Sequence, residues 1–192
     1  MWFVFAFAGS YFLGSIPFGY LIASIKGYDL KEKGSGNIGA TNVFRVVGKK
    51  EGILAFMLDL LKGFIPVMYF SNISPVIGIT ATLGAVLGHI TTPFLKFKGG
   101  KGIATGFGSL LALMPVPALS SFGVWILFVL LTRRVSAGSL VGALALPVFY
   151  FFFSRPTVIP VLIIAILITV MVFITHRSNI RRLIKGEEKP VF

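Results

Sequence analysis

The chain has 192 residues, of which 56% are hydrophobic and 14% aromatic, and its formal net charge is +12. Its mean hydropathy of +0.92 excludes an ordinary soluble domain, because a folded chain of this size cannot bury so much apolar surface. The absence of cysteine excludes disulfides, thiolate metal sites and cysteine nucleophiles. The positive charge fits an anionic membrane surface or an anionic substrate. Nucleic acid is disfavoured, because no soluble basic domain is left outside the apolar segments.

Seven apolar stretches are candidates for membrane-spanning helices, which need roughly 20 apolar residues each. They predict an all-α, polytopic membrane protein in which residues 1–192 form a single transmembrane domain. The first stretch lacks the basic n-region of a secretory signal, so we interpret it as a span. The fourth and fifth are so close together that short spans and a re-entrant hairpin both stay open. The stretches are Trp2–Ile22, Ile53–Phe70, Val76–Thr92, Ile103–Pro117, Ala118–Thr132, Ser136–Phe153 and Thr157–Thr175.

The basic residues predict the orientation of these spans. Sixteen of the 18 Lys and Arg residues lie in four polar stretches, and only Lys62 and Arg155 lie elsewhere. The positive-inside rule places the four stretches in the cytoplasm. Seven spans then put the N-terminus outside and the C-terminus inside. The stretches are Ser24–Glu51, Pro93–Lys101, Arg133–Arg134 and Arg177–Lys189.

Within the spans, two features predict helix packing. Asp59 and Lys62 are three residues apart in the second span, and intramembrane charges usually pair, so we expect an internal ion pair. A proton relay is the alternative for these two residues. Small residues at four-residue spacing allow helices to approach closely. We interpret the pairs Gly84 and Gly88, Gly102 and Gly106, and Gly138 and Gly142 as packing residues.

The first polar stretch contains a glycine-rich loop that suits an anionic ligand. It reads K-G-S-G-N-I-G-A-T-N-V-F-R from Lys33 to Arg45. Its glycines match G-x-G-x-x-G, but a membrane span rather than a strand precedes them, which excludes a dinucleotide fold. Glycine backbones can form an anion nest, and Arg45 offers a planar fork for phosphate, whereas a flexible polar linker is the alternative. The binding candidates are Ser35, Asn37, Gly39, Thr41, Asn42 and Arg45.

The second polar stretch ends in K-G-G-K-G, immediately before a predicted helix at Ile103. Bare backbone amides, a helix N-terminus and lysines together predict a phosphate cradle. The alternative is an ordinary positive-inside turn, which explains the lysines but not the glycines. His89, at the inner end of the third span, could bond loop backbone or take part in chemistry. The cradle candidates are Gly99, Gly100, Lys101 and Gly102.

The third cluster follows the last span and reads H-R-S-N-I-R-R-L-I-K-G-E-E from His176 to Glu188. His176 and Asn179 share a helix face because they are three residues apart, and we assign both to the site. A basic tail lying on anionic lipid is the alternative. It suits Arg181, Arg182 and Lys185, which we assign to the lipid surface.

Together these segments resemble the bacterial membrane glycerol-3-phosphate acyltransferases that use acyl phosphate as donor. The motifs are G-S-I-P-F-G-Y at Gly14–Tyr20, the first loop through Arg45, G-G-K-G at Gly99–Gly102, and H-R-x-N-I-x-R-L-x-x-G-x-E at His176–Glu188. The resemblance implies a seven-span inner-membrane enzyme that acylates the 1-position of glycerol 3-phosphate, giving lysophosphatidic acid in phospholipid synthesis. The functional positions that it implies are Ser35, Arg45, the glycines of Gly99–Gly102, His176, Asn179 and Glu187, the last as a structural residue.

The mechanism expected from these residues is a direct acyl transfer that relies on positioning and charge stabilisation. Arg45 and Lys101 would bind phosphate, and Ser35, Asn37 and Asn179 would orient hydroxyl groups. His176 or the leaving phosphate would accept the proton, and an acyl-Ser35 intermediate is disfavoured because no Ser-His-Asp pattern is visible.

The partners expected are glycerol 3-phosphate, acyl phosphate and membrane lipid, without a metal, cofactor or obligate protein partner. The three segments should then meet at the cytoplasmic edge of the membrane. A transporter or flippase for phosphorylated metabolites or anionic lipid is the rival interpretation. That class should place polar groups near the bilayer midplane or show inverted repeats.

Overall fold

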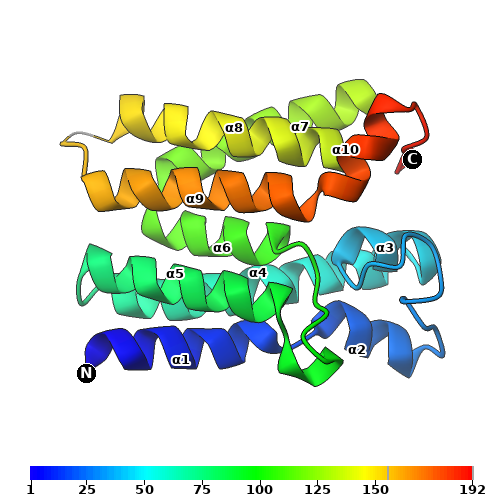
Figure 1. Ribbon diagram of the computed structural model, residues 1–192, viewed down its shortest axis with the longest axis horizontal. Helices are drawn as coiled ribbons and strands as arrows, with labels where there is room; N and C mark the ends of the chain where they lie inside the picture. The colour runs from blue at the N-terminus through cyan, green and yellow to red at the C-terminus, as the bar shows by residue number, and fades with distance from the viewer. Residues whose placement is uncertain (155, 192) are drawn as a thin grey trace. The chain divides into compact units, whose positions relative to one another are not determined.

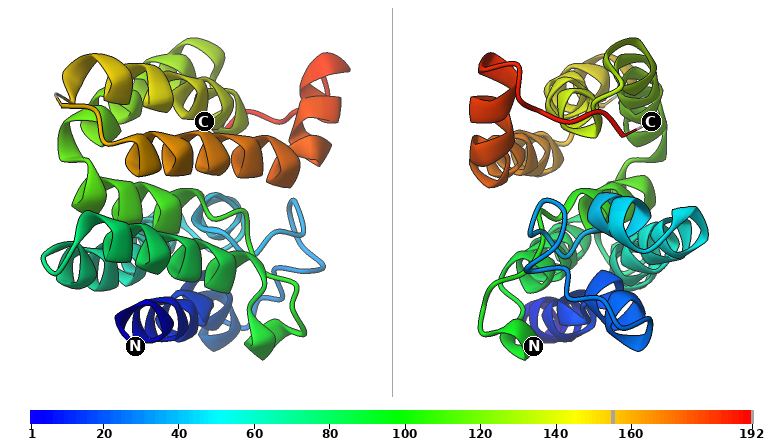
Figure 2. Two further views of the ribbon diagram at one scale, coloured as in Figure 1. Left: turned by 60° about the vertical axis from the view of Figure 1, so that its left-hand side comes forward. Right: turned by 90° about the vertical axis from the view of Figure 1, so that its right-hand side faces the viewer.

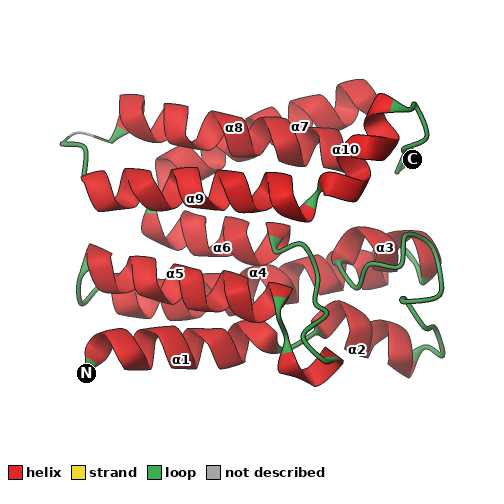
Figure 3. Ribbon diagram, viewed as in Figure 1, coloured by secondary structure: helices red, strands yellow, loops and turns green. Residues whose placement is uncertain are grey.

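The computed structural model describes residues 1–154 and 156–191, so Arg155 lies outside the described residues. The described residues contain α-helices, one short 3-10 helix and no strand, which confirms the all-α class (Figure 3). They divide into two compact units, residues 1–113 and residues 114–192. Each unit is described by itself below, and the single transmembrane domain stays a prediction.

The first unit packs three long helices and the shorter α6, and carries still shorter helices in the connections between them. α5 lies against α1, α4 and α6, and α4 also packs on α1 and α6. α2 and α3 pack on each other and on α4. The helices are α1 (Trp2–Ser15), α2 (Phe18–Ile25), α3 (Ala40–Val46), α4 (Lys49–Ser71), α5 (Pro75–Ile90), η1 (Pro93–Leu95) and α6 (Ile103–Leu113).

The first predicted span is interrupted by Pro17, which separates α1 from α2. Proline has no backbone N–H and disfavours helical geometry in the residue before it. Ile16 accordingly has an extended backbone, with ψ 117°. The break exposes the Ile16 carbonyl inside the unit, where it accepts a hydrogen bond from Lys62 Nζ at 2.6 Å. The segment Trp2–Ile25 is long and apolar enough to cross a membrane, as predicted for Trp2–Ile22, and Pro17 interrupts its helix.

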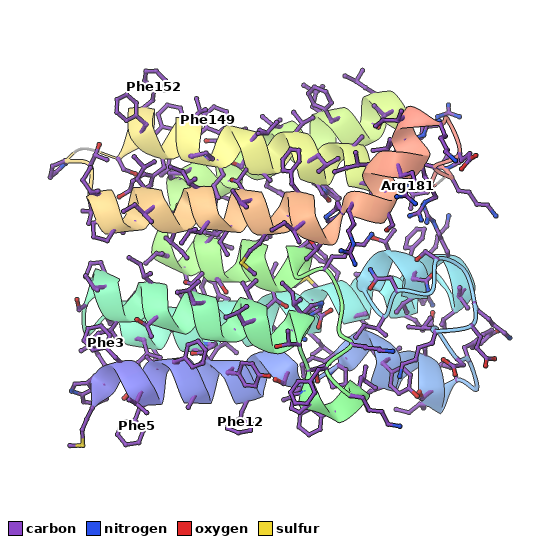
Figure 4. The ribbon with its side chains drawn as sticks, viewed as in Figure 1. Phe3, Phe5, Phe12, Phe149, Phe152 and Arg181 are labelled. Atoms are coloured by element: carbon purple, nitrogen blue, oxygen red, sulfur yellow. The ribbon has the colours of Figure 1, made fainter. Side chains whose placement is uncertain are left out.

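Glycines hold α1 and α5 at backbone contact. A side chain at Gly84 would collide with the Phe7 carbonyl oxygen, and one at Gly88 would collide with that of Tyr11. The packing role predicted for Gly84 and Gly88 is thus confirmed. Aromatic residues of α1 such as Phe12 point away from this seam and are exposed, as expected for a surface in contact with lipid (Figure 4).

The second unit consists of α7, α8 and α9, antiparallel in sequence order, followed by the short α10. Gly138 and Gly142 lie against α7, where the nearest atoms include the backbone oxygens of Trp125 and Ser121, so their packing role is also confirmed. α9 turns into α10 with a bend of 62° (Figure 2). The helices are α7 (Pro115–Thr132), α8 (Val135–Phe153), α9 (Ile159–Thr175) and α10 (Arg177–Ile184).

Gly102 and Gly106 do not have the helix-packing role that was predicted for them. Gly102 precedes α6 and has a left-handed backbone, with φ +79°, so it is a turn residue. Gly106 lies within α6, and a Cβ added there would meet only the Val86 side chain, at an ordinary contact distance of 3.8 Å. Close helix approach therefore does not depend on these two glycines.

In the described part of the chain, five helical segments are long and apolar enough to cross a membrane. A sixth is counted if α9 and α10 are taken as one bent span. The predicted span Ile103–Pro117 is the main departure. α6 ends at Leu113 after 11 residues, which is about 16 Å of helix, and Pro115 begins α7. The structure shows a polytopic helical membrane protein, whereas the count of seven spans stays a prediction.

Candidate functional site

Within each unit, the predicted functional segments lie at one end of the helices. In the first unit, the α2–α3 loop and the α5–α6 loop are both at the end opposite the N-terminus (Figure 1). In the second unit, the α7–α8 turn and α10 are at the same end, and Val191 N–H donates to the Arg133 carbonyl at 2.8 Å. In each unit taken separately, the basic segments therefore lie at one end of the helices. The positive-inside rule expects this arrangement of loops on the cytoplasmic side.

The first loop is organised by the buried side chain of Asn42. Its Oδ1 accepts the Ser35 N–H at 2.9 Å, and its Nδ2 donates to the carbonyls of Lys33 at 3.0 Å and Leu30 at 3.3 Å. Gly34 packs directly on this amide and has φ +67°, so a side chain there would meet both a clash and a strained backbone. Asn42 therefore shapes the loop, whereas the sequence suggested that it donates to substrate.

The other candidates of the first loop are accessible or half-buried. Ser35 is exposed, and Asn37 and Thr41 are half-buried. Gly39 is the residue that precedes α3, and Arg45 is in the last turn of that helix and is half-buried. The loop also rests on α2, because Gly19 allows the Ile38 carbonyl to approach its backbone. The segment is thus a shaped loop and not a flexible linker.

The second loop returns across the end of α5 before α6 begins. Gly99 N–H donates to the Ile90 carbonyl at 2.9 Å, and Gly100 N–H donates to the His89 carbonyl at 3.1 Å. These two amides therefore satisfy the C-terminal carbonyls of α5, and their predicted binding of phosphate stays a prediction. Lys101 is half-buried, and Gly102 supplies the left-handed turn into α6.

A buried polar network lies beside the second loop. Lys62 Nζ is 2.7 Å from Asp59 Oδ1, so the predicted ion pair inside α4 is present. His89 Nδ1 is 3.8 Å from the same carboxylate oxygen and 3.2 Å from Thr105 Oγ1. Lys62, Asp59 and His89 are 3%, 2% and 5% exposed, so the network is shielded from solvent.

In the second unit, His176 is at the bend between α9 and α10. It is 3% exposed, and its Nδ1 is 2.9 Å from the Val172 carbonyl oxygen. A carbonyl can only accept, so Nδ1 carries the proton in this contact, and the neutral ring has its lone pair on Nε2. The ring is therefore oriented by α9 in a defined tautomer.

Glu188 is the centre of a second buried cluster, which joins α10 to the start of α8. Its Oε1 accepts from Asn179 Nδ2 at 2.6 Å and from Ser136 Oγ at 2.9 Å. Its Oε2 accepts from Arg182 Nε at 2.6 Å, and Arg134 Nε donates to its backbone carbonyl at 2.9 Å. Burial alone would raise the pKa of Glu188, but the hydrogen bonds from Arg182, Asn179 and Ser136 lower it below its ordinary value.

This cluster corrects the structural assignment of Glu187. The Glu187 side chain is exposed, whereas Glu188 is 6% exposed and makes the bonds expected of a structural carboxylate. The left-handed Gly186, with φ +71°, reverses the chain and turns the second glutamate inward. The contacts of Ser136 and Arg134 with Glu188 were also not predicted from the sequence. Their position at the α7–α8 turn was the one feature that pointed to this cluster.

The described residues contain no group of three His, Asp or Glu side chains that could hold a metal ion. The first unit thus offers the two loops with Arg45 and Lys101, and the second unit offers His176 and the Glu188 cluster. The prediction that these segments form one site stays a prediction.

Comparison with known proteins identifies relatives along nearly the whole chain. The family model described as glycerol-3-phosphate acyltransferase matches residues 4–186. A glycerol-3-phosphate acyltransferase from Trichlorobacter lovleyi is 46% identical over 187 residues, covering 96% of this chain and 95% of that protein. One from Aquifex aeolicus is 46% identical over 183 residues, covering 93% and 94%.

Two solved structures share this fold. Both are of PlsY (YgiH), an integral membrane glycerol 3-phosphate acyltransferase, and both are 42% identical to this chain. The glycerol 3-phosphate form superimposes with a TM-score of 0.93 and the lysophosphatidic acid form with 0.90. Each comparison covers 98% of this chain and 94% of that structure.

Proposed function

Because this chain belongs to the glycerol-3-phosphate acyltransferase family, we propose that it acylates the 1-position of glycerol 3-phosphate and forms lysophosphatidic acid. The observation that carries this proposal is the pair of solved relatives, one a glycerol 3-phosphate form and the other a lysophosphatidic acid form. These are the acceptor and the product of such a reaction. The product is a precursor of membrane phospholipid.

The acyl donor we propose is an acyl phosphate. It is a mixed anhydride with a good leaving group, so the protein needs to supply mainly positioning and charge stabilisation. The 1-hydroxyl oxygen of glycerol 3-phosphate attacks the acyl carbon, the bond from that carbon to the phosphate oxygen breaks, and inorganic phosphate leaves. The hydroxyl proton goes to a base or to the leaving phosphate. This balance requires neither a metal nor a redox cofactor.

Phosphate binding is assigned to the first unit. Arg45 carries a planar guanidinium on α3, beside a loop whose shape is set by Asn42, and Lys101 lies at the positive end of α6. Ser35 is exposed and Asn37 half-buried on the first loop, which suits hydrogen bonding to glycerol hydroxyls. Gly39 precedes α3, and Thr41 lies in the first turn of that helix.

Proton transfer is assigned to His176 in the second unit, with the leaving phosphate as the alternative acceptor. The contact with Val172 holds the Nδ1 proton and directs the basic lone pair to Nε2. Asn179 has a positioning role, because its Nδ2 donates to Glu188 and so ties α10 to α8. The role predicted for Asn179 in orienting substrate hydroxyl groups stays a prediction, separate from its bond to Glu188.

We place the functional ends of both units on the cytoplasmic side of the inner membrane. The support is the concentration of lysine and arginine at these ends, which the positive-inside rule assigns to the cytoplasm. With α6 as a short pass and α9 as a further pass, the five candidate spans become seven. The N-terminus is then outside and the C-terminus in the cytoplasm.

The test uses the purified full-length protein in detergent with acyl phosphate and labelled glycerol 3-phosphate. Ester formation without a second compartment supports the proposal, and labelled substrate uptake that occurs only in sealed vesicles would replace it with transport. Lys101→Ala should lower kcat/KM by roughly 100-fold, as expected for loss of a hydrogen bond between charged groups. Lys98→Ala, at an exposed position three residues earlier, is the matched control and should leave it within about 3-fold.

Ser35 separates the direct transfer from a two-step reaction. The proposal predicts no covalent acyl-protein when the enzyme is quenched during turnover with labelled acyl phosphate. A trapped acyl group that is absent from Ser35→Ala would show an acyl-enzyme and contradict the direct transfer.

A further inference from the structure

The residues beside Lys101 are held by His89, a group for which the proposed reaction has no chemical use. Gly100 precedes Lys101, and its N–H donates to the His89 carbonyl at 3.1 Å. A side chain at Gly100 would collide with the Nε2 edge of the His89 ring. On the other side of Lys101, Thr105 Oγ1 in the first turns of α6 is 3.2 Å from His89 Nδ1. One side chain thus contacts both flanks of the lysine.

The His89 ring is itself anchored to a second part of the unit. Its Nδ1 is 3.8 Å from Asp59 Oδ1, which pairs with Lys62 at 2.7 Å, and Lys62 donates to the Ile16 carbonyl at 2.6 Å. Ile16 is at the break between α1 and α2. A continuous series of buried polar contacts therefore connects this break, through α4 and α5, to the second loop.

Two further bonds fix the end of α5 against α1. Thr92 Oγ1 donates to the Ser15 carbonyl at 2.6 Å, and the Tyr11 hydroxyl donates to the Thr91 carbonyl at 2.8 Å. The backbone from which His89 extends is thus held on α1 directly as well as through the ion pair. Such buried, satisfied networks make a local arrangement rigid, because breaking one member leaves another without its partner.

We propose that His89 is the positioning residue of the second loop: it sets the place of Lys101 by holding Gly100 and Thr105, and the Asp59–Lys62 pair anchors its ring. Residue 100 is then glycine because the His89 ring occupies the space of a side chain. Its backbone does not demand glycine, since Gly100 is not among the positive-φ glycines, unlike Gly102 with φ +79°. This inference rests on the proposed phosphate-binding role of Lys101.

The two explanations of Gly100 make different predictions for a double-mutant cycle. If the His89 ring excludes a side chain, Gly100→Ala is harmful in the natural protein and is tolerated once the ring is made smaller. If a substrate phosphate needs the bare backbone, the same change is equally harmful in both backgrounds. His89→Asn provides the second background, because its amide lies near the position of Nδ1 and no atom takes the place of Nε2.

The experiment measures ester formation with acyl phosphate and glycerol 3-phosphate for Gly100→Ala, His89→Asn and the double variant. We expect Gly100→Ala alone to lower kcat/KM by roughly 10- to 100-fold, because displacing a binding group by about 1 Å costs that much. The loss should fall mainly on the KM of at least one phosphate substrate. In the His89→Asn background, Gly100→Ala should cost less than about 3-fold. Gly106→Ala, which meets only the Val86 side chain at 3.8 Å, is the matched control and should be neutral.

His89→Gln completes the comparison. Its amide reaches the position of Nε2 and not that of Nδ1, so it should lower activity more than His89→Asn does. Equal cost of Gly100→Ala in both backgrounds, or a loss confined to kcat, would overturn the inference. If Gly100→Ala prevents folding, recovery of folded protein in the double variant supports the inference, and no recovery contradicts it. An inactive natural protein would instead contradict the proposed function itself.

Discussion

A prediction from the second unit compares two adjacent glutamates, the exposed Glu187 and the buried Glu188. Glu188→Ala removes the acceptor of two buried hydrogen bonds, from Ser136 and Asn179, and of a third from Arg182. Glu187→Ala removes an exposed side chain one residue earlier. We expect the first change to destabilise the protein strongly and the second to leave its stability unchanged within about 0.5 kcal/mol.

The size of the effect follows from the contacts. A hydrogen bond to a charged group contributes about 1.5–3 kcal/mol, so the bonds from Ser136 and Asn179 amount to about 3–6 kcal/mol. The Arg182 side chain is 35% exposed, and its ion pair with Glu188 adds only about 0–1 kcal/mol. For a chain of this length each kcal/mol shifts the unfolding midpoint by about 2–4 °C. The expected decrease for Glu188→Ala is therefore about 6–28 °C.

Thermal unfolding in detergent measures this decrease. Trp125, whose Nε1 donates to Ser139 at 3.3 Å, reports on the second unit by fluorescence. Size-exclusion chromatography after heating gives an independent midpoint for loss of folded protein. Equal midpoints for the two variants, or a larger decrease for Glu187→Ala, would refute the assignment of the structural carboxylate to Glu188.

Three further results are expected. The pKa of Glu188 is lowered in the folded protein, so its stabilising contribution is present above the ordinary pKa of 4.5 and is lost as the pH falls below it. The midpoint of thermal unfolding should therefore decrease on acidification. In Glu188→Gln this decrease should be smaller, because the side chain no longer titrates. Asp59→Asn or Lys62→Met alone should lower the free energy of unfolding by about 3–5 kcal/mol, because each leaves a buried polar group unpaired. In the same thermal assay, the double variant should lose less than the sum of the two single losses. Asn42→Asp keeps the acceptor for Ser35 but loses both donated bonds, so kcat/KM for ester formation should fall roughly 10- to 100-fold; unchanged kinetics would contradict the shaping role of Asn42.

Local spacing in the sequence predicted the features that depend on neighbouring residues. The Asp59–Lys62 ion pair was predictable because residues three apart on a helix face the same way. The close packing at Gly84 and Gly88 followed from their four-residue spacing. The all-α membrane class followed from the length and hydropathy of the apolar stretches. In each case the decisive partner is on the same helix, or the effect requires only a small residue.

Features that depend on distant partners could not be read in this way. The amides of Gly99 and Gly100 bind carbonyls of α5, and nothing in the K-G-G-K-G motif indicates that they are already occupied. The assignment of the structural role to Glu187 was a misalignment by one residue, because the motif at His176–Glu188 itself ends on Glu188, which the structure shows to be buried. The break at Pro17 was not predicted from the sequence, and the bond from Lys62 to the Ile16 carbonyl depends on the fold.

The backbone seam between α1 and α5 has a consequence for how the protein is made. α1 leaves the ribosome before α5, its glycine-lined partner, which ends about 75 residues later, at Ile90. Until α5 is inserted, the face of α1 that contacts Gly84 and Gly88 has lipid tails as its neighbours. Assembly of the first unit therefore has to wait for translation of α4 and α5. A bulky substitution at Gly84 or Gly88 would then act on the nascent chain, reducing the yield of inserted protein before any assay of the finished enzyme could detect a defect.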